Sequence, residues 1–316
     1  MISVPVGRIV EIANDRRHLS LYRGFMVVTD TESRAAMARV PIDDVAAVIA
    51  HAYGLSYTNN LLEALAVRCA PLVVCGSNHN AVAMLVPVEG HGLQAGRFDA
   101  QIRASLPMRK RLWAEIVRSK LRHQAAVLGA IAAPTAPITA LIPRVRSGDS
   151  TNVEAQAAKR YWSLLFGSEF RRDRDADGPN AMLNYGYTVM RSAVARAVIA
   201  AGLHPTLGLF HSHQGNAMRL VDDLIEPFRP LVDAEVHRLH RNGALTVSSE
   251  VKRALAGILY TDRRTSDGTT PLIACINRLA TSLAQVYLGE RKSLLLPEAS
   301  ALEAPQTTSS SVTDDG

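Results

Sequence analysis

The spacing of apolar residues changes near Glu89, and this change constrains the fold more than any other feature of the chain. Before it, short apolar and β-branched runs at residues 8–12, 19–29 and 45–51 are separated by polar breaks, as in strands joined by turns. After it, apolar residues recur three and four positions apart, as in amphipathic helices. The sequence therefore predicts an α+β protein of two domains, a division that its 316 residues also favour.

The first predicted domain covers residues 1–88, and its strands and single helix at 56–69 indicate a β-rich, sandwich-like unit. Three glycines in residues 89–97 indicate a linker. Residues 98–292 form a larger all-α domain in this interpretation. Its helices are expected at residues 112–128, 151–166, 181–201, 217–226, 230–240 and 248–259. Residues 293–316 are small, polar and acidic, so we expect a disordered tail.

The charge of the chain is unevenly distributed. The formal net charge is +6, and the last twenty residues contribute −4 and contain no Lys or Arg. The preceding residues therefore carry +10, and a basic body of this kind favours a polyanionic partner such as nucleic acid. The net charge alone does not separate this interpretation from a solvated basic surface.

No segment is expected to enter a membrane. The uncharged run that begins after Arg122 is long enough to cross a bilayer, but Pro134, Pro137 and Pro143 interrupt it. The first residues lack the basic and apolar regions of a secretory signal. We therefore expect a cytoplasmic protein.

Glu154 is the first candidate for chemistry, because the usual nucleophile, phosphate-loop and zinc-protease motifs are absent from the sequence. It follows Thr151 by three residues at the start of a predicted helix, a spacing typical of a capping box. Alanines at positions 155, 157 and 158 provide a small surface, on which the carboxylate would instead face a site. The residues alone favour the cap and leave both interpretations open.

Asp222, Asp223 and Glu226 form an acidic cluster. Asp222 and Asp223 precede Glu226 by four and three residues, so on a helix either pair shares a face. The apolar residues between them draw part of the cluster towards the interior, where carboxylates need a cationic partner. A divalent ion is one such partner, and Arg219 or Arg229 is the alternative.

Three histidines, His204, His211 and His213, precede this cluster. No further nitrogen or sulfur ligand follows at zinc spacing, so zinc is not expected. Glutamates and a histidine with nearby aspartates make a mostly oxygen site, which suits Mg²⁺ or Mn²⁺, and the imidazole favours Mn²⁺. With a basic body, such a site fits a metal-dependent nuclease.

Three segments together resemble one protein family. They are PIDDVAAVIAHAYGLSYTNNLLEALAVRCAPLVVCGSNH, GDSTNVEAQAAKRYWSLLFG and NAMLNYGYTVMRSAVARAVIAAGLHPTLGLFHSHQGNAMRLVDDLIEPFRPLVD. In this order they resemble the CRISPR-associated integrase and endonuclease of spacer acquisition, the first-numbered Cas protein. The ending IEPFRP is similar to the form found beside single-effector (type II) systems, and the resemblance runs over residues 41–232.

The resemblance implies which residues form the site. The motif glutamate of the family falls on Glu154, its histidine on His211 and its acidic ligand on Glu226, so these three would be catalytic and hold Mg²⁺ or Mn²⁺. Some branches of the family carry Asp at the last position. Asp223 matches a further acidic position, and Asp222 is a second supporting candidate.

Contacts to DNA are assigned to a different set of residues. Lys120 and Gln124 match a recurrent K-x-x-x-Q in the family, although a plain amphipathic helix explains them almost as well. The other candidates are basic residues of the same predicted helix and one histidine: Arg109, Lys110, Arg118, Arg122 and His213. Such residues would neutralise backbone phosphates.

The resemblance also implies a reaction and partners. The 3′-hydroxyl of a captured DNA fragment, the prespacer, would attack a phosphodiester at the end of a CRISPR repeat next to the leader. The family assembles as homodimers joined through the β-domains. Two such dimers flank a dimer of the small second-numbered Cas protein, which makes a heterohexamer, and further Cas proteins of the locus can join.

Two other functions are compatible with the same residues. A metal-dependent, structure-selective DNA endonuclease would use water in place of the 3′-hydroxyl. A non-catalytic basic DNA-binding scaffold would use Glu154 as a helix cap and leave the acids of residues 222–226 in ion pairs.

Overall fold

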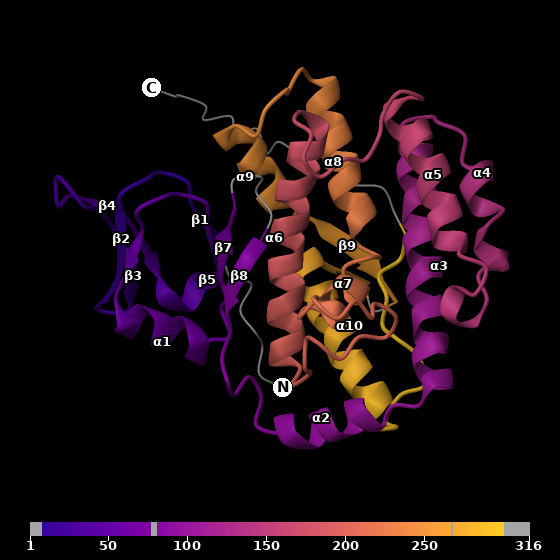
Figure 1. Cartoon of the computed structure of the whole chain (residues 1–316), viewed down its shortest axis with the longest axis horizontal. Coiled ribbons are helices and arrows are strands. Elements are labelled where there is room, and N and C mark those ends of the chain that lie inside the picture. Colours follow the sequence, from indigo (N-terminus) through magenta and orange to yellow (C-terminus); the bar gives the residue numbers. More distant parts are fainter. Residues whose placement is uncertain (1–7, 77–80, 267, 300–316) are drawn as a thin grey trace, which may run out of the picture.

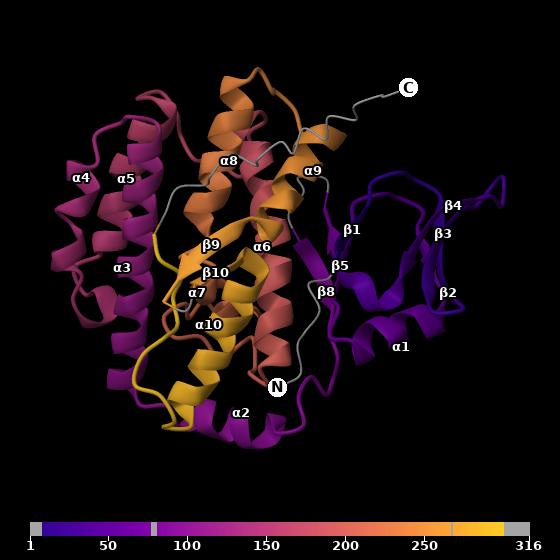
Figure 2. The ribbon, with the colours of Figure 1, turned by 180° about the vertical axis from the view of Figure 1, so that it is seen from behind.

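The computed structural model describes residues 8–76, 81–266 and 268–299. A smaller part made of strands lies beside a larger part made mostly of helices, and the two views of the ribbon show the same division (Figures 1 and 2). The predicted α+β architecture, with strands first and helices after, is confirmed.

Two four-stranded sheets and helix α1 (Asn59–Val67) form the N-terminal part. The strands of the first sheet are, in order, β1 (Arg8–Ile12), β5 (Val45–Ala50), β7 (Leu72–Cys75) and β8 (Ala81–Leu85). Those of the second are β4 (Ala36–Pro41), β3 (Phe25–Asp30), β2 (Arg17–Tyr22) and β6 (Ser56–Tyr57), and a 3₁₀ turn at Ile42–Asp44 leads from β4 to β5. The apolar run expected at 19–29 is a hairpin, because Arg23 and Gly24 turn the chain with positive φ.

Strand β5 joins the two parts of the molecule. All six of its residues are buried. Neighbouring side chains on a strand point to opposite faces. Val48 accordingly packs in the core between α1 and the sheets, while Ile49 packs in the core of the helical part. Helix α6 packs on this second face. Strand β5 therefore contributes one face to each of the two cores.

Nine α-helices are described in the C-terminal part. They are α2 (Gln94–Arg103), α3 (Leu106–Ala130), α4 (Ala136–Thr139), α5 (Val153–Phe166), α6 (Pro179–Ala200), α7 (Arg219–Leu224), α8 (Arg229–Arg241), α9 (Ser249–Gly257) and α10 (Leu272–Tyr287). Short 3₁₀ turns occur at Ile142–Arg144, Ser147–Asp149 and Ile258–Tyr260. Helix α6 is buried along most of its length and contacts α7, α8, α9 and α10. It packs closely on α8, since a Cβ at Gly186 would lie 2.4 Å from Val232.

Three expectations need correction. The second part is not all helix, because β9 (Asp262–Thr265) and β10 (Gly268–Pro271) form a hairpin of largely polar, threonine-rich strands. The expected linker at 89–97 is shorter, because α2 begins at Gln94. The tail is not disordered from residue 293, because Leu294 is buried and its N–H donates to Glu115. The tail residues 300–316 lie outside the described residues.

Among the described residues, no helix has the length and apolar character needed to cross a membrane. The prolines of the run at 123–143 prevent one continuous helix, as expected. Helix α3 ends at Ala130, before Pro134, and the rest of the run forms the short helix α4 and a 3₁₀ turn.

Candidate metal and DNA site

Glu154 lies in the first turn of α5, but it does not cap that helix. The cap is Asp149, whose two carboxylate oxygens accept from the N–H groups of Val153 and Glu154, each at 2.9 Å. The chain reaches this position through a left-handed residue, Asn152, with φ of 53°. Because Asp149 satisfies these N–H groups, the carboxylate of Glu154 is free for another partner. The predicted capping box with Thr151 is therefore replaced by a cap from Asp149.

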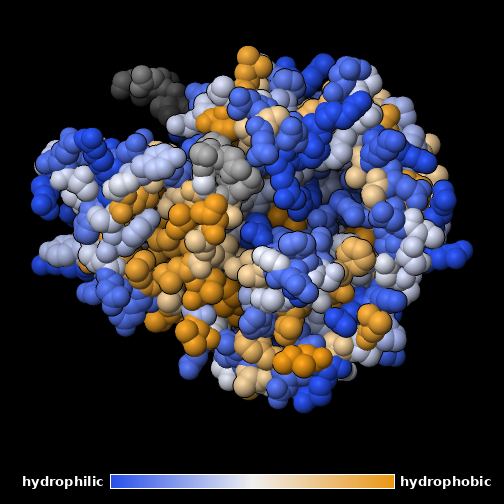
Figure 3. Space-filling view, viewed as in Figure 1, coloured by the Kyte–Doolittle hydropathy of each residue, from blue (hydrophilic) through white to orange (hydrophobic). Residues whose placement is uncertain are grey.

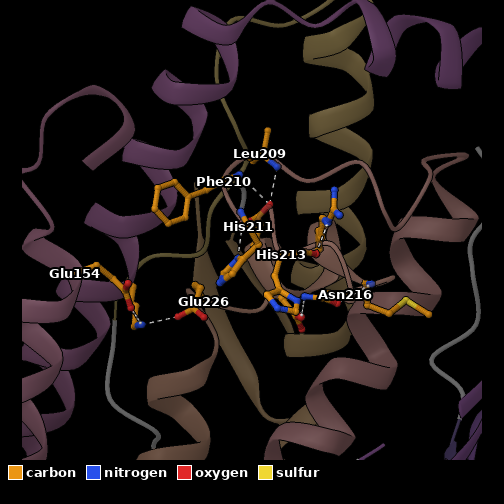
Figure 4. A network of polar contacts seen from close by, with 12 residues as sticks. Glu154, Leu209, Phe210, His211, His213, Asn216 and Glu226 are labelled. Atoms are coloured by element: carbon orange, nitrogen blue, oxygen red, sulfur yellow. Dashed lines mark hydrogen bonds and ion pairs between the residues drawn. The ribbon is translucent and has the colours of Figure 1, made fainter. Parts of the chain in front are cut away.

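The partner of Glu154 is the ammonium group of Lys120, which comes from the middle of α3. Lys120 Nζ lies 2.5 Å from Glu154 Oε1 and 2.5 Å from Glu226 Oε2. Its side chain is 9% exposed, so the contact is shielded from solvent. One cation thus joins carboxylates from two distant segments (Figure 4).

Glu226 lies in the turn between α7 and α8 and has a second cationic neighbour. Arg229 Nε lies 2.8 Å from its other oxygen, Oε1. Burial acts to raise the pKa of Glu226, but the charges of Arg229 and Lys120 outweigh it and lower that pKa below its usual value. Burial likewise acts to lower the pKa of Lys120, and the carboxylates of Glu226 and Glu154 raise it. Glu226 and Lys120 are therefore both charged at neutral pH.

His211 lies in the irregular segment that follows α6. This segment wraps around Asp223, which is fully buried and accepts from the N–H groups of Leu209 at 2.6 Å, Phe210 at 3.2 Å and His211 at 3.1 Å. There is no room for a side chain at Gly208, where a Cβ would lie 2.8 Å from Asp223 Oδ2. Asp223 thus fixes the backbone that carries the histidine.

The imidazole ring of His211 is held as well. Its Nδ1 lies 2.7 Å from Asp223 Oδ1. This hydrogen bond is the main reason that the pKa of His211 is raised, against the effect of burial. A proton on Nδ1 leaves Nε2 as the atom available to a ligand. The ring also makes an edge contact with Trp113, on which Phe210 stacks with ring centroids 4.5 Å apart.

The acidic cluster separates in space. Helix α7 ends at Leu224, two residues before Glu226, so the shared helix face predicted for Glu226 and its preceding aspartates is not formed. Asp223 supports the histidine segment, and Asp222 pairs with Arg191 and accepts from Asn216 Nδ2. Both aspartates therefore already have partners of their own. Arg229, which the sequence offers as an alternative to a metal ion as the cationic partner of these acids, forms an ion pair with Glu226.

The donor set fits a hard divalent ion. Glu154 and Glu226 converge on one point, where the ammonium of Lys120 meets the buried oxygen Oε2 of Glu226. In Figure 4 the side chain of Glu226 is drawn between those of Glu154 and His211. As they stand, no three His, Cys, Asp or Glu side chains of the described part form a metal-binding group, and the ammonium of Lys120 lies between two of the donors. An ion would enter only where that ammonium moves aside.

The residues predicted to contact DNA are divided between the interior and the surface. Lys120 and Gln124 are buried, and Arg118 donates to the carbonyl of Val145 at 2.5 Å. Arg109 is partly buried. Three residues of the set lie exposed on the surface, namely Lys110, Arg122 and His213.

A basic cleft of about 570 Å³ opens next to His211, and most of its charge was missed by sequence reasoning. Its lining includes four arginines: Arg172, Arg174, Arg191 and Arg229. His213 and Asn216 also line it. The run RRDRD at residues 171–175 was the available signal, but alternating charges of this kind also occur on solvated loops.

Sequence comparisons identify relatives over most of the chain. The family model of the CRISPR associated protein Cas1 matches residues 10–266. The CRISPR-associated endonuclease Cas1 of Neisseria meningitidis serogroup C is 36% identical over 264 residues, which cover 82% of this chain and 86% of that protein. The CRISPR-associated endonuclease Cas1 1 of Pyrobaculum aerophilum is 31% identical over 275 residues, which cover 81% of this chain and 89% of that protein.

Solved structures share the fold at low identity. A casposase bound to integration product superposes with a TM-score of 0.77 and 17% identity over 91% of this chain and 92% of the other. A chain of a Cas6-RT-Cas1–Cas2 complex superposes with a TM-score of 0.74 and 16% identity, over 92% of this chain and 36% of the other. A Cas1 protein from Thermotoga maritima superposes with a TM-score of 0.72 and 17% identity, over 94% of this chain and 99% of the other.

Proposed function

The chain belongs to the Cas1 family of CRISPR-associated proteins, and from that premise we propose that it is a metal-dependent DNA integrase of CRISPR adaptation. The family membership confirms the resemblance carried by the three sequence segments. One observation carries the proposal for the site, namely the convergence of Glu154 and Glu226 on a single cation.

Glu154, Glu226 and His211, through Nε2, would hold Mg²⁺ or Mn²⁺, with the imidazole favouring Mn²⁺. The bound ion supplies positive charge that stabilises the attacked phosphate. Asp223 keeps a proton on Nδ1 of His211 and so fixes the ring with Nε2 free. The stack of Phe210 on Trp113 limits movement of the same segment.

The reaction is a transesterification. The 3′-hydroxyl oxygen of a captured fragment attacks phosphorus in a strand of the repeat and loses its proton. The bond from that phosphorus to the 3′ oxygen of the strand breaks, and this oxygen leaves as a new 3′-hydroxyl. One phosphodiester is exchanged for another, so no nucleotide cofactor is needed. The same site with water as nucleophile would act as an endonuclease.

The basic cleft beside His211 is the proposed path of the DNA backbone. Arg172 and Arg174 line it, and no ion pair to an acidic side chain is observed for either one in the described residues. Arginine neutralises phosphates and releases their counterions, so binding would weaken steeply with salt. The cleft is continuous with the surface that carries exposed His213.

The described relatives support this reaction and its partners. The Neisseria meningitidis relative is an endonuclease, and the casposase of similar fold is bound to integration product. A similar chain occurs in a complex with Cas2. We therefore extend the proposal to double-stranded prespacer and leader–repeat DNA, and to a heterohexamer with the small second Cas protein.

A homodimer joined through the β-rich part is included in the proposal. Figure 3 shows an apolar area on the side of this part that adjoins the helical part. Strand β8 is an edge strand, and exposed apolar side chains on β7 and β8 include Val74, Val82 and Leu85. Edge strands with exposed apolar residues are suited to pairing with another chain.

A strand-transfer assay tests the function. The full chain and its small Cas partner are mixed with a short duplex carrying 3′-hydroxyl ends and a plasmid carrying leader and repeat, in Mn²⁺, Mg²⁺ or EDTA. Covalent joining that requires metal and is lost in Glu154→Ala, His211→Ala and Glu226→Ala is expected. Cutting without joining would support the endonuclease, and DNA binding unaffected by EDTA without any product would support the scaffold.

A further inference from the structure

Lys120 stands where a cation bound by Glu154 and Glu226 would stand. Its ammonium is 2.5 Å from a carboxylate oxygen of each residue, and Glu226 and Lys120 are both shielded from solvent. Two carboxylates at one buried point repel each other unless a cation lies between them. Lys120 therefore holds this part of the site together when no metal ion is bound.

The charges around this point are already balanced. Lys120 and Arg229 provide two positive charges for the two negative charges of Glu154 and Glu226. Asp222 forms an ion pair with Arg191, and Asp223 is hydrogen-bonded to the ring of His211. A divalent ion added to this arrangement would bring two uncompensated positive charges into a poorly solvated region, which is unfavourable.

An anion removes this imbalance, and DNA supplies one next to the site. A backbone phosphate in the arginine-lined cleft would bring negative charge next to His211, one of the proposed metal ligands. The flexible stem of a lysine allows its ammonium to move from the glutamates to a phosphate oxygen. Arg229 is less free to move, because it pairs with Glu226 and lies over the ring of Tyr187 at 4.7 Å.

We propose that Lys120 is the resident cation of the metal-free site and makes tight binding of a divalent ion depend on bound DNA. This inference rests on the proposed metal-dependent function. It goes beyond that function because it concerns the order and coupling of binding and not the reaction itself. Because such coupling is reciprocal, the metal ion would also strengthen DNA binding.

The test measures Mn²⁺ binding without using activity. Free Mn²⁺ is followed by electron paramagnetic resonance in titrations of the full chain, with and without a duplex whose 3′ ends are dideoxy and cannot react. The variants are Lys120→Met and Lys120→Gln. The matched control is Lys159→Met, which removes an exposed lysine from α5, the helix that carries Glu154. Circular dichroism and thermal unfolding establish that each variant is folded.

For the wild type and Lys159→Met, DNA should tighten Mn²⁺ binding at least about tenfold, given the strength of charge interactions in a poorly solvated site. Without DNA, both Lys120 variants should bind Mn²⁺ at least about tenfold more tightly than the wild type, and DNA should add little. Their metal-free forms should unfold at lower temperature, and Mn²⁺ should raise that temperature more than in the wild type.

Two outcomes would overturn the inference in distinguishable ways. If the Lys120 variants bind Mn²⁺ as the wild type does, or more weakly, while DNA still tightens binding in all of them, Lys120 is not the source of the coupling and the metal site stands. If none of the proteins binds Mn²⁺ with or without DNA, the metal-dependent function fails together with this inference.

Discussion

His211 makes two contacts to a single oxygen of Asp223: its backbone N–H at 3.1 Å and its ring Nδ1 at 2.7 Å. Asp223 is fully buried and lies only twelve residues further along the chain. The residue therefore controls both the position of the segment and the orientation of the ring, and the site depends on it without needing it as a ligand.

Asp223→Asn should lower strand transfer about 10- to 100-fold, as is usual when a support of a metal-binding histidine is lost. The amide would turn an NH₂ group towards N–H donors that now meet a carboxylate, so the free energy of unfolding should fall by about 2 kcal/mol. Joined product and urea unfolding measure the two effects. Asp222→Asn is the control, and equal losses in both variants would contradict a special role for Asp223.

Gly208→Ala should reduce strand transfer strongly, because the new methyl group would lie 2.8 Å from Asp223 Oδ2, 2.9 Å from Arg219 Cβ and 3.0 Å from the carbonyl oxygen of His211. Two of these neighbours are fixed by the backbone and cannot move cheaply. Gly215→Ala is a matched control in the same segment, where the nearest atom, at 3.3 Å, belongs to the exposed side chain of His213. Activity assays at equal protein concentration compare them, and similar activities would contradict the steric argument.

Asp149→Ala should lower the free energy of unfolding by about 1–2 kcal/mol, because it removes the cap of α5. Asp149→Asn should lose less, since an amide oxygen still accepts one of the two N–H groups. Thr151→Ala should have almost no effect, although the sequence favours Thr151 as the cap. Chemical denaturation measures all three variants, and a large effect of Thr151→Ala with none at Asp149 would restore the capping-box interpretation.

His123 should make the stability depend on pH. Burial lowers the pKa of this histidine to about 4, whereas its usual value lies near 6.5. Below pH 6.5 the unfolded chain binds a proton that the folded chain does not bind, so the free energy of unfolding falls until pH 4 is reached. The loss attributable to this group is at most about 3 kcal/mol.

His123→Gln isolates this contribution, because glutamine does not titrate. The measured quantity is the difference between the unfolding free energies of wild type and variant at each pH from 4 to 8. This difference should change between pH 6.5 and 4 and stay constant above pH 7. A constant difference over the whole range would mean that His123 has the same pKa in the folded and the unfolded chain.

The elements of the fold were largely predictable where one face of a segment is apolar. The helices expected at 151–166 and 181–201 begin and end within two residues of α5 and α6. Strand β4 was missed because four of its six residues are exposed, so no apolar alternation marks it. Helix α10 was not predicted, although its buried residues, such as Leu272, Cys275 and Leu279, recur at helical spacing.

The site was less predictable because its key contacts join distant segments. Lys120 meets Glu154 and Glu226 across 34 and 106 positions of sequence, and helical spacing reports only neighbours three or four residues apart. Local spacing was also misleading for Asp222, which faces Arg191, since α7 ends before Glu226. Family resemblance pointed to Glu154, His211 and Glu226, and their assignment as ligands remains a prediction.

Strand β5 has a consequence for the synthesis of the protein. One face of this strand lies in each core, and the helix that covers its second face starts at Pro179. During translation the strand emerges long before that helix, and its second apolar face stays uncovered in the meantime. The two parts are therefore poor candidates for separate expression. Cutting the chain between them should give fragments that aggregate when made alone and assemble when made together.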